Sequence, residues 1–94
     1  MSTKYTMIDP VDLLTGETMS MDGYTVAGPW MPVGEPPARA REGAPDSKIV
    51  MLRMEVGGKT IETPGWYSHE EHRWYVWGLY KGGEITNWTE AKYE

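Results

Sequence analysis

The chain contains neither cysteine nor phenylalanine, and it has no long apolar run. The absence of cysteine excludes the disulfide framework that stabilises many small secreted domains, which favours an intracellular protein. The amino-terminal letters MSTKYTMIDP lack the apolar segment of a signal peptide. No stretch approaches the ~20 apolar residues that a membrane helix needs. We therefore expect a cytoplasmic protein with no membrane partner.

Positive charge is also scarce, because 9 lysines and arginines stand against 14 aspartates and glutamates, for a net charge of −5. Binding to a nucleic-acid backbone requires a positive protein surface that displaces counterions. This charge balance argues against nucleic acid as a partner. The acidic residues are scattered, and no run exceeds Glu70-Glu71, so the chain does not have the dense acidic array of a nucleic-acid mimic.

A chain of 94 residues indicates one domain. Such a chain hides only about 60–65% of its unfolded surface on folding, so a few large side chains must build its core. The 5 tryptophans, 6 tyrosines and 7 methionines take the place of phenylalanine. Each buried aromatic side chain removes roughly 150–250 Å² from water. These side chains are therefore candidates for the core first and for a binding surface second.

Two elements are expected in the first 29 residues. Asp9 and Pro10 suit the start of a short helix over residues 10–15, and Gly16 suits its end. The alternation that follows, with Asp22-Gly23 in its middle, predicts a β-hairpin. We expect residues 1–29 to form this extension and residues 30–94 to form a small antiparallel β domain, the two packing as one compact unit.

The second half of the chain predicts a mainly β fold with strands near 48–56, 59–63, 73–80 and 84–88. Residues 28–45 hold five of the seven prolines and are expected to form a loop. The strand at 73–80 has two apolar faces, and Trp74 and Trp88 are expected to anchor the core. One face of that strand consists of Trp74, Val76 and Tyr80, and the other consists of Tyr75, Trp77 and Leu79. We expect this strand to be central, or its second face to be covered by the amino-terminal region or by a partner.

The spacing of these aromatic residues resembles a family of short phage and prophage domains of unknown function (domain of unknown function 551). The resemblance covers residues 30–88. It is carried by WMPV at 30–33, Pro45, IVML at 49–52, GWY at 65–67, HRWY at 72–75 and ITNW at 85–88. It implies a small antiparallel β domain from a phage or mobile element in a bacterial host cell, and it implies no activity. Asn87 stands where the family usually has histidine, so no role of that histidine carries over.

Few residues suggest chemistry. In HEEH, His69 and His72 would lie on one face only on a helical turn, and a zinc site would need a third ligand, for which Glu70, Glu71 or a distant aspartate would have to serve. There is no thiol and no G-x-S-x-G motif. The letters VGGKT do not form a phosphate-binding loop, because Arg53 stands where the first glycine would be. We therefore expect no enzyme, no cofactor and no metal, and we interpret the two histidines as solvated turn residues.

Binding is the favoured class of function, because tryptophan, tyrosine, methionine and arginine are enriched at interfaces. The first hypothesis is a protein that docks on a host protein through Tyr75, Trp77 and Leu79, and that inhibits a defence or regulatory complex. The second is capture of a nucleotide-like ligand by the side chains of Arg39, Arg41, Trp66 and Tyr67. The third is a structural accessory domain that self-associates as a homo-oligomer. The net negative charge favours the first over the second.

Overall fold

The structure, a computed structural model, describes residues 5–8 and 23–93. The strands are β1 (Tyr5–Ile8), β2 (Tyr24–Val26), β3 (Met31–Pro32), β4 (Val50–Val56), β5 (Lys59–Ser68), β6 (Arg73–Trp77) and β7 (Glu84–Tyr93). Within these described ranges there is no helix, and hence none that could cross a membrane. The helix expected at 10–15 and the first half of the expected hairpin lie outside the described residues.

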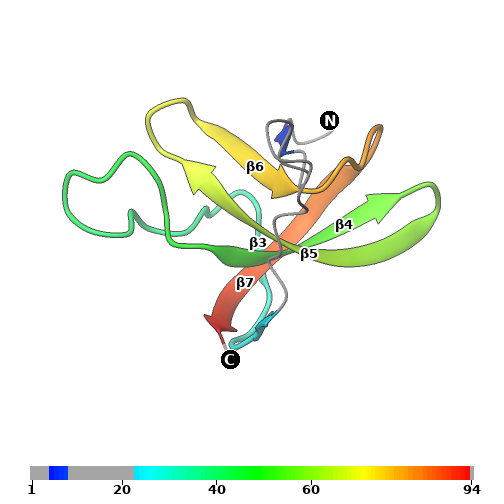
Figure 1. Cartoon of the computed structure of the whole chain (residues 1–94), viewed down its shortest axis with the longest axis horizontal. Coiled ribbons are helices and arrows are strands. Elements are labelled where there is room, and N and C mark those ends of the chain that lie inside the picture. Colours follow the sequence, from blue (N-terminus) through cyan, green and yellow to red (C-terminus); the bar gives the residue numbers. More distant parts are fainter. Residues whose placement is uncertain (1–4, 9–22, 94) are drawn as a thin grey trace, which may run out of the picture.

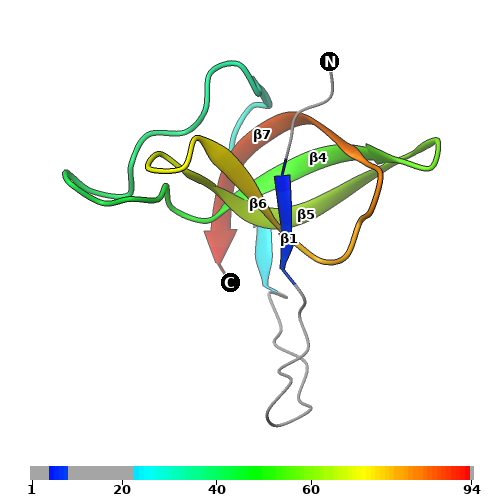
Figure 2. The same cartoon turned by 90° about the horizontal axis from the view of Figure 1, so that it is seen from above.

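All strands belong to one twisted sheet with the order β1-β6-β5-β4-β7-β2, and β3 also pairs with β7 (Figure 1). The prediction of a mainly β fold is confirmed. Every pairing is antiparallel except that of β1 with β6, which is parallel. In Figure 2, β1 lies in front of the end of β6, with which it pairs. Both described pieces of the first 29 residues, β1 and β2, are thus strands at the two ends of the sheet order.

β6 is an interior strand, because it pairs with β1 on one side and with β5 on the other, although β5 and β4 occupy the middle of the sheet order. The β4–β5 hairpin itself agrees with the sequence. Gly57 and Gly58 have φ values of 57° and 79° between the paired residues Val56 and Lys59. Two successive residues with positive φ match the right-handed twist of a hairpin, and glycine adopts them without steric cost.

The second strand of this hairpin is longer than predicted, since β5 continues past residue 63 to Ser68. Pro64 stands in its middle, although proline cannot donate a ladder hydrogen bond. The β5–β6 ladder reaches only to the Gly65–Val76 pair. Beyond it, the Thr63 hydroxyl donates to the main-chain oxygen of Trp77 at 2.7 Å. A side chain therefore supplies the donor near the point where the main-chain ladder stops.

The other two boundaries also shift. β6 ends at Trp77 instead of residue 80, because Gly78 turns away with φ 123° and donates its N–H to the Ile8 carbonyl at 2.9 Å. β7 runs to Tyr93 instead of residue 88. Its polar end is a strand because β4 pairs with it as far as Glu90, and β2 pairs with residues 91–93 from the other side.

The core lies on one face of the sheet. Its buried cluster consists of Val50, Leu52, Met54, Trp74, Val76 and Ile85. Side chains of β6 and β7 meet in this cluster although β5 and β4 separate the two strands, so the sheet must curl around it. A bulge contributes to the twist: the register shifts between Arg53 and Met54, and Thr86 donates to the Arg53 carbonyl at 3.2 Å. Trp74 is 3% exposed, whereas Trp88 packs on the cluster but is only half-buried.

Candidate binding surface

Three aromatic side chains lie on the face of the sheet opposite the core, which we call the outer face. Along β6, Trp74 and Val76 are buried in the core, so the alternation of a strand directs Tyr75 and Trp77 to the outer face. Trp66 of β5 is the register partner of Tyr75. We call Trp66, Tyr75 and Trp77 the aromatic surface. All three are half-buried, so part of each ring remains accessible.

The contact between Trp66 and Tyr75 is a parallel stack. Their ring centroids are 5.4 Å apart and their planes differ by 6°. Direct cross-strand neighbours are close enough for such ring contacts. On the other side of β6, Thr6 and Ile8 of β1 are the register partners of Tyr75 and Trp77. The edge strand thus continues the outer face beyond the aromatic surface.

A pocket of about 360 Å³ opens beside the stacked rings. We call it the acidic pocket, and it is lined by Pro45, Asp46, Trp66, Ser68, Glu70, Glu71 and Tyr75. The loop before β4 brings Asp46 to this place. Asp46 forms a β-bridge with Ser68. The next residue, Ser47, donates its N–H to the Tyr67 carbonyl at 2.9 Å.

The turn between β5 and β6 positions the other acidic side chains. The N–H of Glu71 donates to the Ser68 hydroxyl at 3.1 Å, which closes the turn. The Tyr75 hydroxyl in turn donates a hydrogen bond to the Glu71 carboxylate. This bond, followed by partial desolvation and the negative charge of Glu71, raises the pKa of Tyr75 above its ordinary value of 10.0. Tyr75 is therefore a protonated donor at neutral pH, and Glu71 is held at the pocket wall.

The third residue of the predicted partner surface, Leu79, is not part of a strand. It follows Gly78 and is 61% exposed. Tyr80, which the alternation predicts for the core face, does pack against the core, and its carbonyl accepts a hydrogen bond from the Tyr5 hydroxyl. The alternation predicted for 73–80 thus places Tyr75 and Trp77 on one strand face, while the position of Leu79 follows from the loop.

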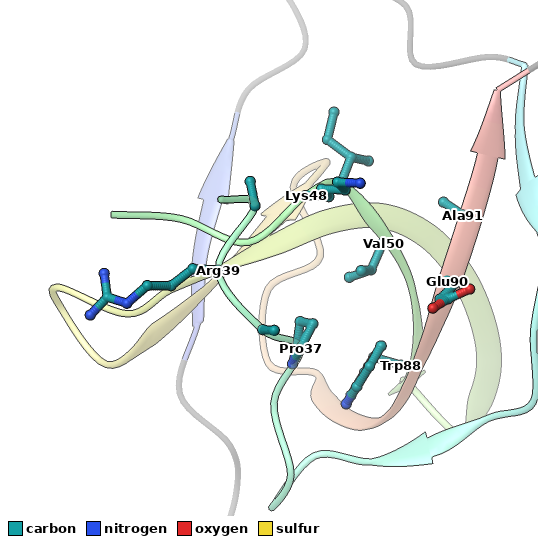
Figure 3. Close-up of a pocket in the computed structure, with 10 residues that line it drawn as sticks. Pro37, Arg39, Lys48, Val50, Trp88, Glu90 and Ala91 are labelled. Atoms are coloured by element: carbon teal, nitrogen blue, oxygen red, sulfur yellow. The ribbon is translucent and has the colours of Figure 1, made fainter. Parts of the chain in front are cut away.

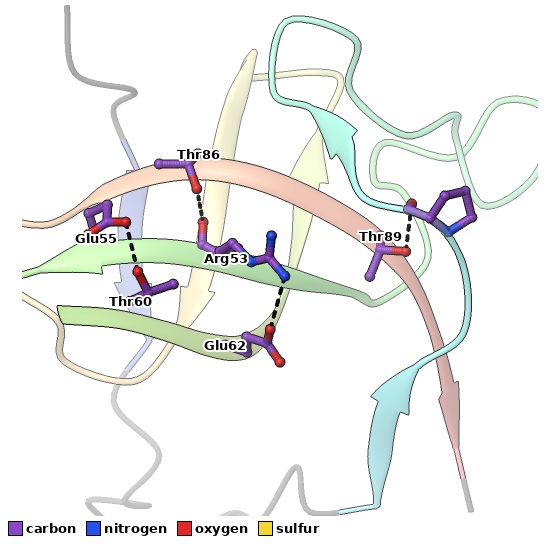
Figure 4. Close-up of polar contacts among 7 residues, drawn as sticks. Arg53, Glu55, Thr60, Glu62, Thr86 and Thr89 are labelled. Atoms are coloured by element: carbon purple, nitrogen blue, oxygen red, sulfur yellow. Dashed lines mark hydrogen bonds and ion pairs between the residues drawn. The ribbon is translucent and has the colours of Figure 1, made fainter.

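The half of the outer face that β4 and β7 form is covered by residues 29 and 30 of the same chain. Thr89 is fully buried, and its hydroxyl donates to the Pro29 carbonyl at 2.9 Å (Figure 4). Its register partner Met51 is 7% exposed. Next to them the guanidinium of Arg53 lies over the Trp30 ring, 4.0 Å from its centroid. Residues 29 and 30 therefore close this half, and the aromatic surface on β5 and β6 is the half that remains accessible among the described residues.

The four residues proposed for a nucleotide-like ligand are not gathered at one place. Trp66 and Tyr67 are successive residues of β5 and project to opposite faces, where Tyr67 packs edge-on against Trp74 at 5.0 Å. Arg39 donates through Nη1 to the Ala44 carbonyl at 2.5 Å, within its own loop. Arg41 is exposed on the same loop.

Arg39 does line a second pocket, a cleft of about 410 Å³ between this loop and the strands β4 and β7. Its other walls include Pro37, Lys48, Val50 and Trp88. Figure 3 shows the side chain of Arg39 pointing away from Trp88. The indole N–H of Trp88 is already used, because it donates to the Glu35 carbonyl at 2.8 Å. Arg41 is not among the lining residues, so the cleft does not combine an aromatic side chain with both arginines.

Of the two histidines expected to be solvated, His72 is exposed, whereas His69 is not. His69 is half-buried, its Nε2 donates to the Pro37 carbonyl at 2.7 Å, and its ring packs edge-on against Tyr67 at 5.0 Å. It fastens the loop before β4 to the end of β5. His72 is exposed and has a φ of 55°. In the part of the chain that the structure describes, no three His, Asp or Glu side chains are grouped as metal ligands.

Two residues beside Tyr75, namely Trp66 and Asp46, were not predicted for this surface. The ligand hypothesis pairs Trp66 with Tyr67, yet Trp66 belongs with Tyr75; extending the strand to residue 68 would have placed it on the outer face. Asp46 had no sequence signal at all, because only the β-bridge to Ser68 brings it there.

Comparisons with protein families, with curated proteins and with solved structures found no match for this chain.

Proposed function

We propose that this chain is a non-enzymatic binding protein that docks on another protein through the aromatic surface. The observation that supports this most is the arrangement of Trp66, Tyr75 and Trp77 on the accessible half of the outer face. An accessible group of large aromatic side chains on a small domain is typical of an interaction site. Tryptophan and tyrosine are also the residue types that dominate binding energy at protein interfaces.

The resemblance to phage domains makes a host protein the expected partner, and inhibition of a host complex the expected consequence. Self-association through the same surface is the alternative within this class. The nucleotide hypothesis has less support, because Trp66 lies beside three carboxylates that would repel a phosphate, and because Arg39 and Arg41 lie on a loop that is occupied with its own contacts.

The test begins with native mass spectrometry of the full chain purified from its host, which distinguishes a heteromeric complex, a homo-oligomer and a bound nucleotide. Trp77→Ala should keep the fold and abolish the association. Tyr93→Ala is the matched control, because this exposed aromatic residue lies at the far end of β7 and should leave the association intact. A monomer without a partner, or a Trp77→Ala variant that keeps every association, would contradict the proposal.

A further inference from the structure

We infer that the acidic pocket receives an arginine side chain of the docking partner. This inference rests on the proposed function, since it names the chemistry of a partner that lies on the adjoining aromatic surface. It adds the charge of the partner and the position of one anchoring residue. The pocket and the surface share Trp66 and Tyr75, so one docking event would occupy both.

The charges of the pocket are of one sign. Its ionisable side chains besides Tyr75 are Asp46, Glu70 and Glu71, and no lysine or arginine lines it. Glu71 accepts the hydrogen bond of Tyr75. Among the described residues, no side chain forms a hydrogen bond or ion pair with the carboxylates of Asp46 and Glu70. Two carboxylates are therefore available to accept hydrogen bonds from a cation, and the net charge of −5 favours the approach of a positive partner.

The chemical groups that line the pocket favour one type of cation over another. Its wall contains the parallel rings of Trp66 and Tyr75, and a planar guanidinium can stack on such a face while its N–H groups point sideways. Carboxylates beside the ring plane are suited to accept those N–H groups as charge-assisted hydrogen bonds. An ammonium group has no plane to stack and is more strongly hydrated. The combination of aromatic rings and carboxylates in one pocket therefore favours arginine over lysine.

The same sheet face already contains this arrangement with an arginine in place. The Arg53 guanidinium lies 4.0 Å from the centroid of the Trp30 ring, and its Nη2 is 3.4 Å from the Glu62 carboxylate. Figure 4 shows the contact between Arg53 and Glu62. The acidic pocket likewise combines aromatic rings with carboxylates, and no cation of this chain is among its lining residues.

One cation of the chain lies near the pocket and has to be considered. Arg73 is exposed on β6, two residues before Tyr75, and its charge acts on the Tyr75 hydroxyl. Among the described residues, Arg73 forms no ion pair with the pocket carboxylates. The salt bridge of the described chain joins Arg53 and Glu62, which lie outside the pocket. If Arg73 competed with an incoming guanidinium, its removal would strengthen binding, so the variant Arg73→Ser should bind arginine at least as well as the natural chain.

The experiment titrates the ¹⁵N-labelled full chain with N-acetyl-arginine amide and follows the indole N–H resonances. The Trp66 resonance, assigned by its loss in Trp66→Phe, should move saturably with a dissociation constant on the order of millimolar. N-acetyl-norleucine amide, which has no charge, should not move it, and N-acetyl-lysine amide should move it less. Equal effects of all three probes, or no saturable effect of the arginine probe, would overturn the inference.

The charge requirement is tested with two double variants that remove the same number of charges. Asp46→Asn with Glu70→Gln should weaken arginine binding by about tenfold, because two charge-assisted hydrogen bonds are lost. Glu55→Gln with Glu84→Gln is the matched control, since this cross-strand pair lies at the other end of β4 and β7. The control should change the affinity less than about twofold at physiological salt, where distant charges are screened. Unchanged binding by the Asp46/Glu70 variant would also overturn the inference.

The two proposals fail in different ways. If Trp77→Ala abolishes the association but the arginine probe does not bind at Trp66, the function stands and the arginine site is wrong. If the probe binds at Trp66 but Trp77→Ala keeps every association, the arginine site stands and the docking function is wrong.

Discussion

The rings of Trp66 and Tyr75 stack in parallel on the outer face, with 5.4 Å between their centroids and 6° between their planes. These two residues belong to different strands, and their contact depends on the β5–β6 register that sets Trp66 directly opposite Tyr75. The stack joins the aromatic surface to the acidic pocket, because both residues belong to each. Both proposals depend on this stack, which is held in place by the core face of β6, the close approach of the strands at Gly65 and the turn between β5 and β6.

The two faces of β6 should respond differently to truncation. Trp74 is 3% exposed and packs against Tyr67, so Trp74→Ala should lower the free energy of unfolding by about 3–5 kcal/mol. Trp77→Ala on the outer face should cost clearly less, because its side chain is only half-buried. Trp88→Ala should also cost less than Trp74→Ala, for the same reason. Urea unfolding followed by circular dichroism measures all three. A Trp74→Ala variant as stable as Trp77→Ala would show that the assignment of faces is wrong.

Gly65 should not tolerate a side chain. A Cβ at this position would lie 2.4 Å from Leu52 Cδ1 and 2.4 Å from the Tyr75 carbonyl oxygen, both well inside van der Waals contact. Gly65→Ala should therefore destabilise the protein by roughly 1–3 kcal/mol or more, as overpacking of a core does. Gly34→Ala is the control, because a Cβ at that position would meet nothing within 4 Å. Equal melting temperatures of the two variants would contradict the close approach of β4, β5 and β6 at Gly65.

The hydrogen bond from Tyr75 to Glu71 gives a pH dependence whose sign is defined. The folded-state pKa of Tyr75 is raised above its unfolded value, so the stabilisation is complete below the unfolded pKa of about 10 and is lost as the pH rises through the folded pKa. Absorbance at 295 nm should show one tyrosine ionising later than in Glu71→Gln. Tyr75→Phe should remove that late transition. A titration that is the same in the natural chain and in Glu71→Gln would refute the contact.

The two histidines should have unequal effects on stability. His69→Ala removes the hydrogen bond to the Pro37 carbonyl and the ring contact with Tyr67, so it should cost about 1 kcal/mol. His72→Ala should change stability by no more than about 0.5 kcal/mol, because the side chain is exposed. His72→Gly should stabilise the turn, since a φ of 55° favours glycine. Hydrogen exchange of the Ser47 N–H reports on the loop, and slower or unchanged exchange in His69→Ala would show that His69 does not fasten it.

The features that depend on neighbours along the chain were predictable from the amino-acid pattern alone. The alternation of Val50, Leu52 and Met54 predicted the buried face of β4, and that of Trp74 and Val76 predicted the buried face of β6. Both patterns are reliable because side chains of a strand alternate between faces whatever its partners are. The Gly57-Gly58 turn was predictable for the same reason, since positive φ at two successive residues is a local requirement of the hairpin.

Which distant segments pair depends on the folded arrangement of the whole chain, and this pairing sets the lengths of the strands. The polar end of β7 is a strand because β4 and β2 supply its hydrogen bonds from either side, and β6 stops where Gly78 turns toward Ile8. Asp46 reaches the acidic pocket through its bridge to Ser68, and Trp66 joins Tyr75 through the β5–β6 register. Main-chain hydrogen bonds between segments far apart in sequence leave no pattern in either segment alone. The alternation of β6 therefore predicted that Tyr75 and Trp77 share a face, whereas the positions of Trp66 and Asp46 beside them depend on how the strands and the loop pair.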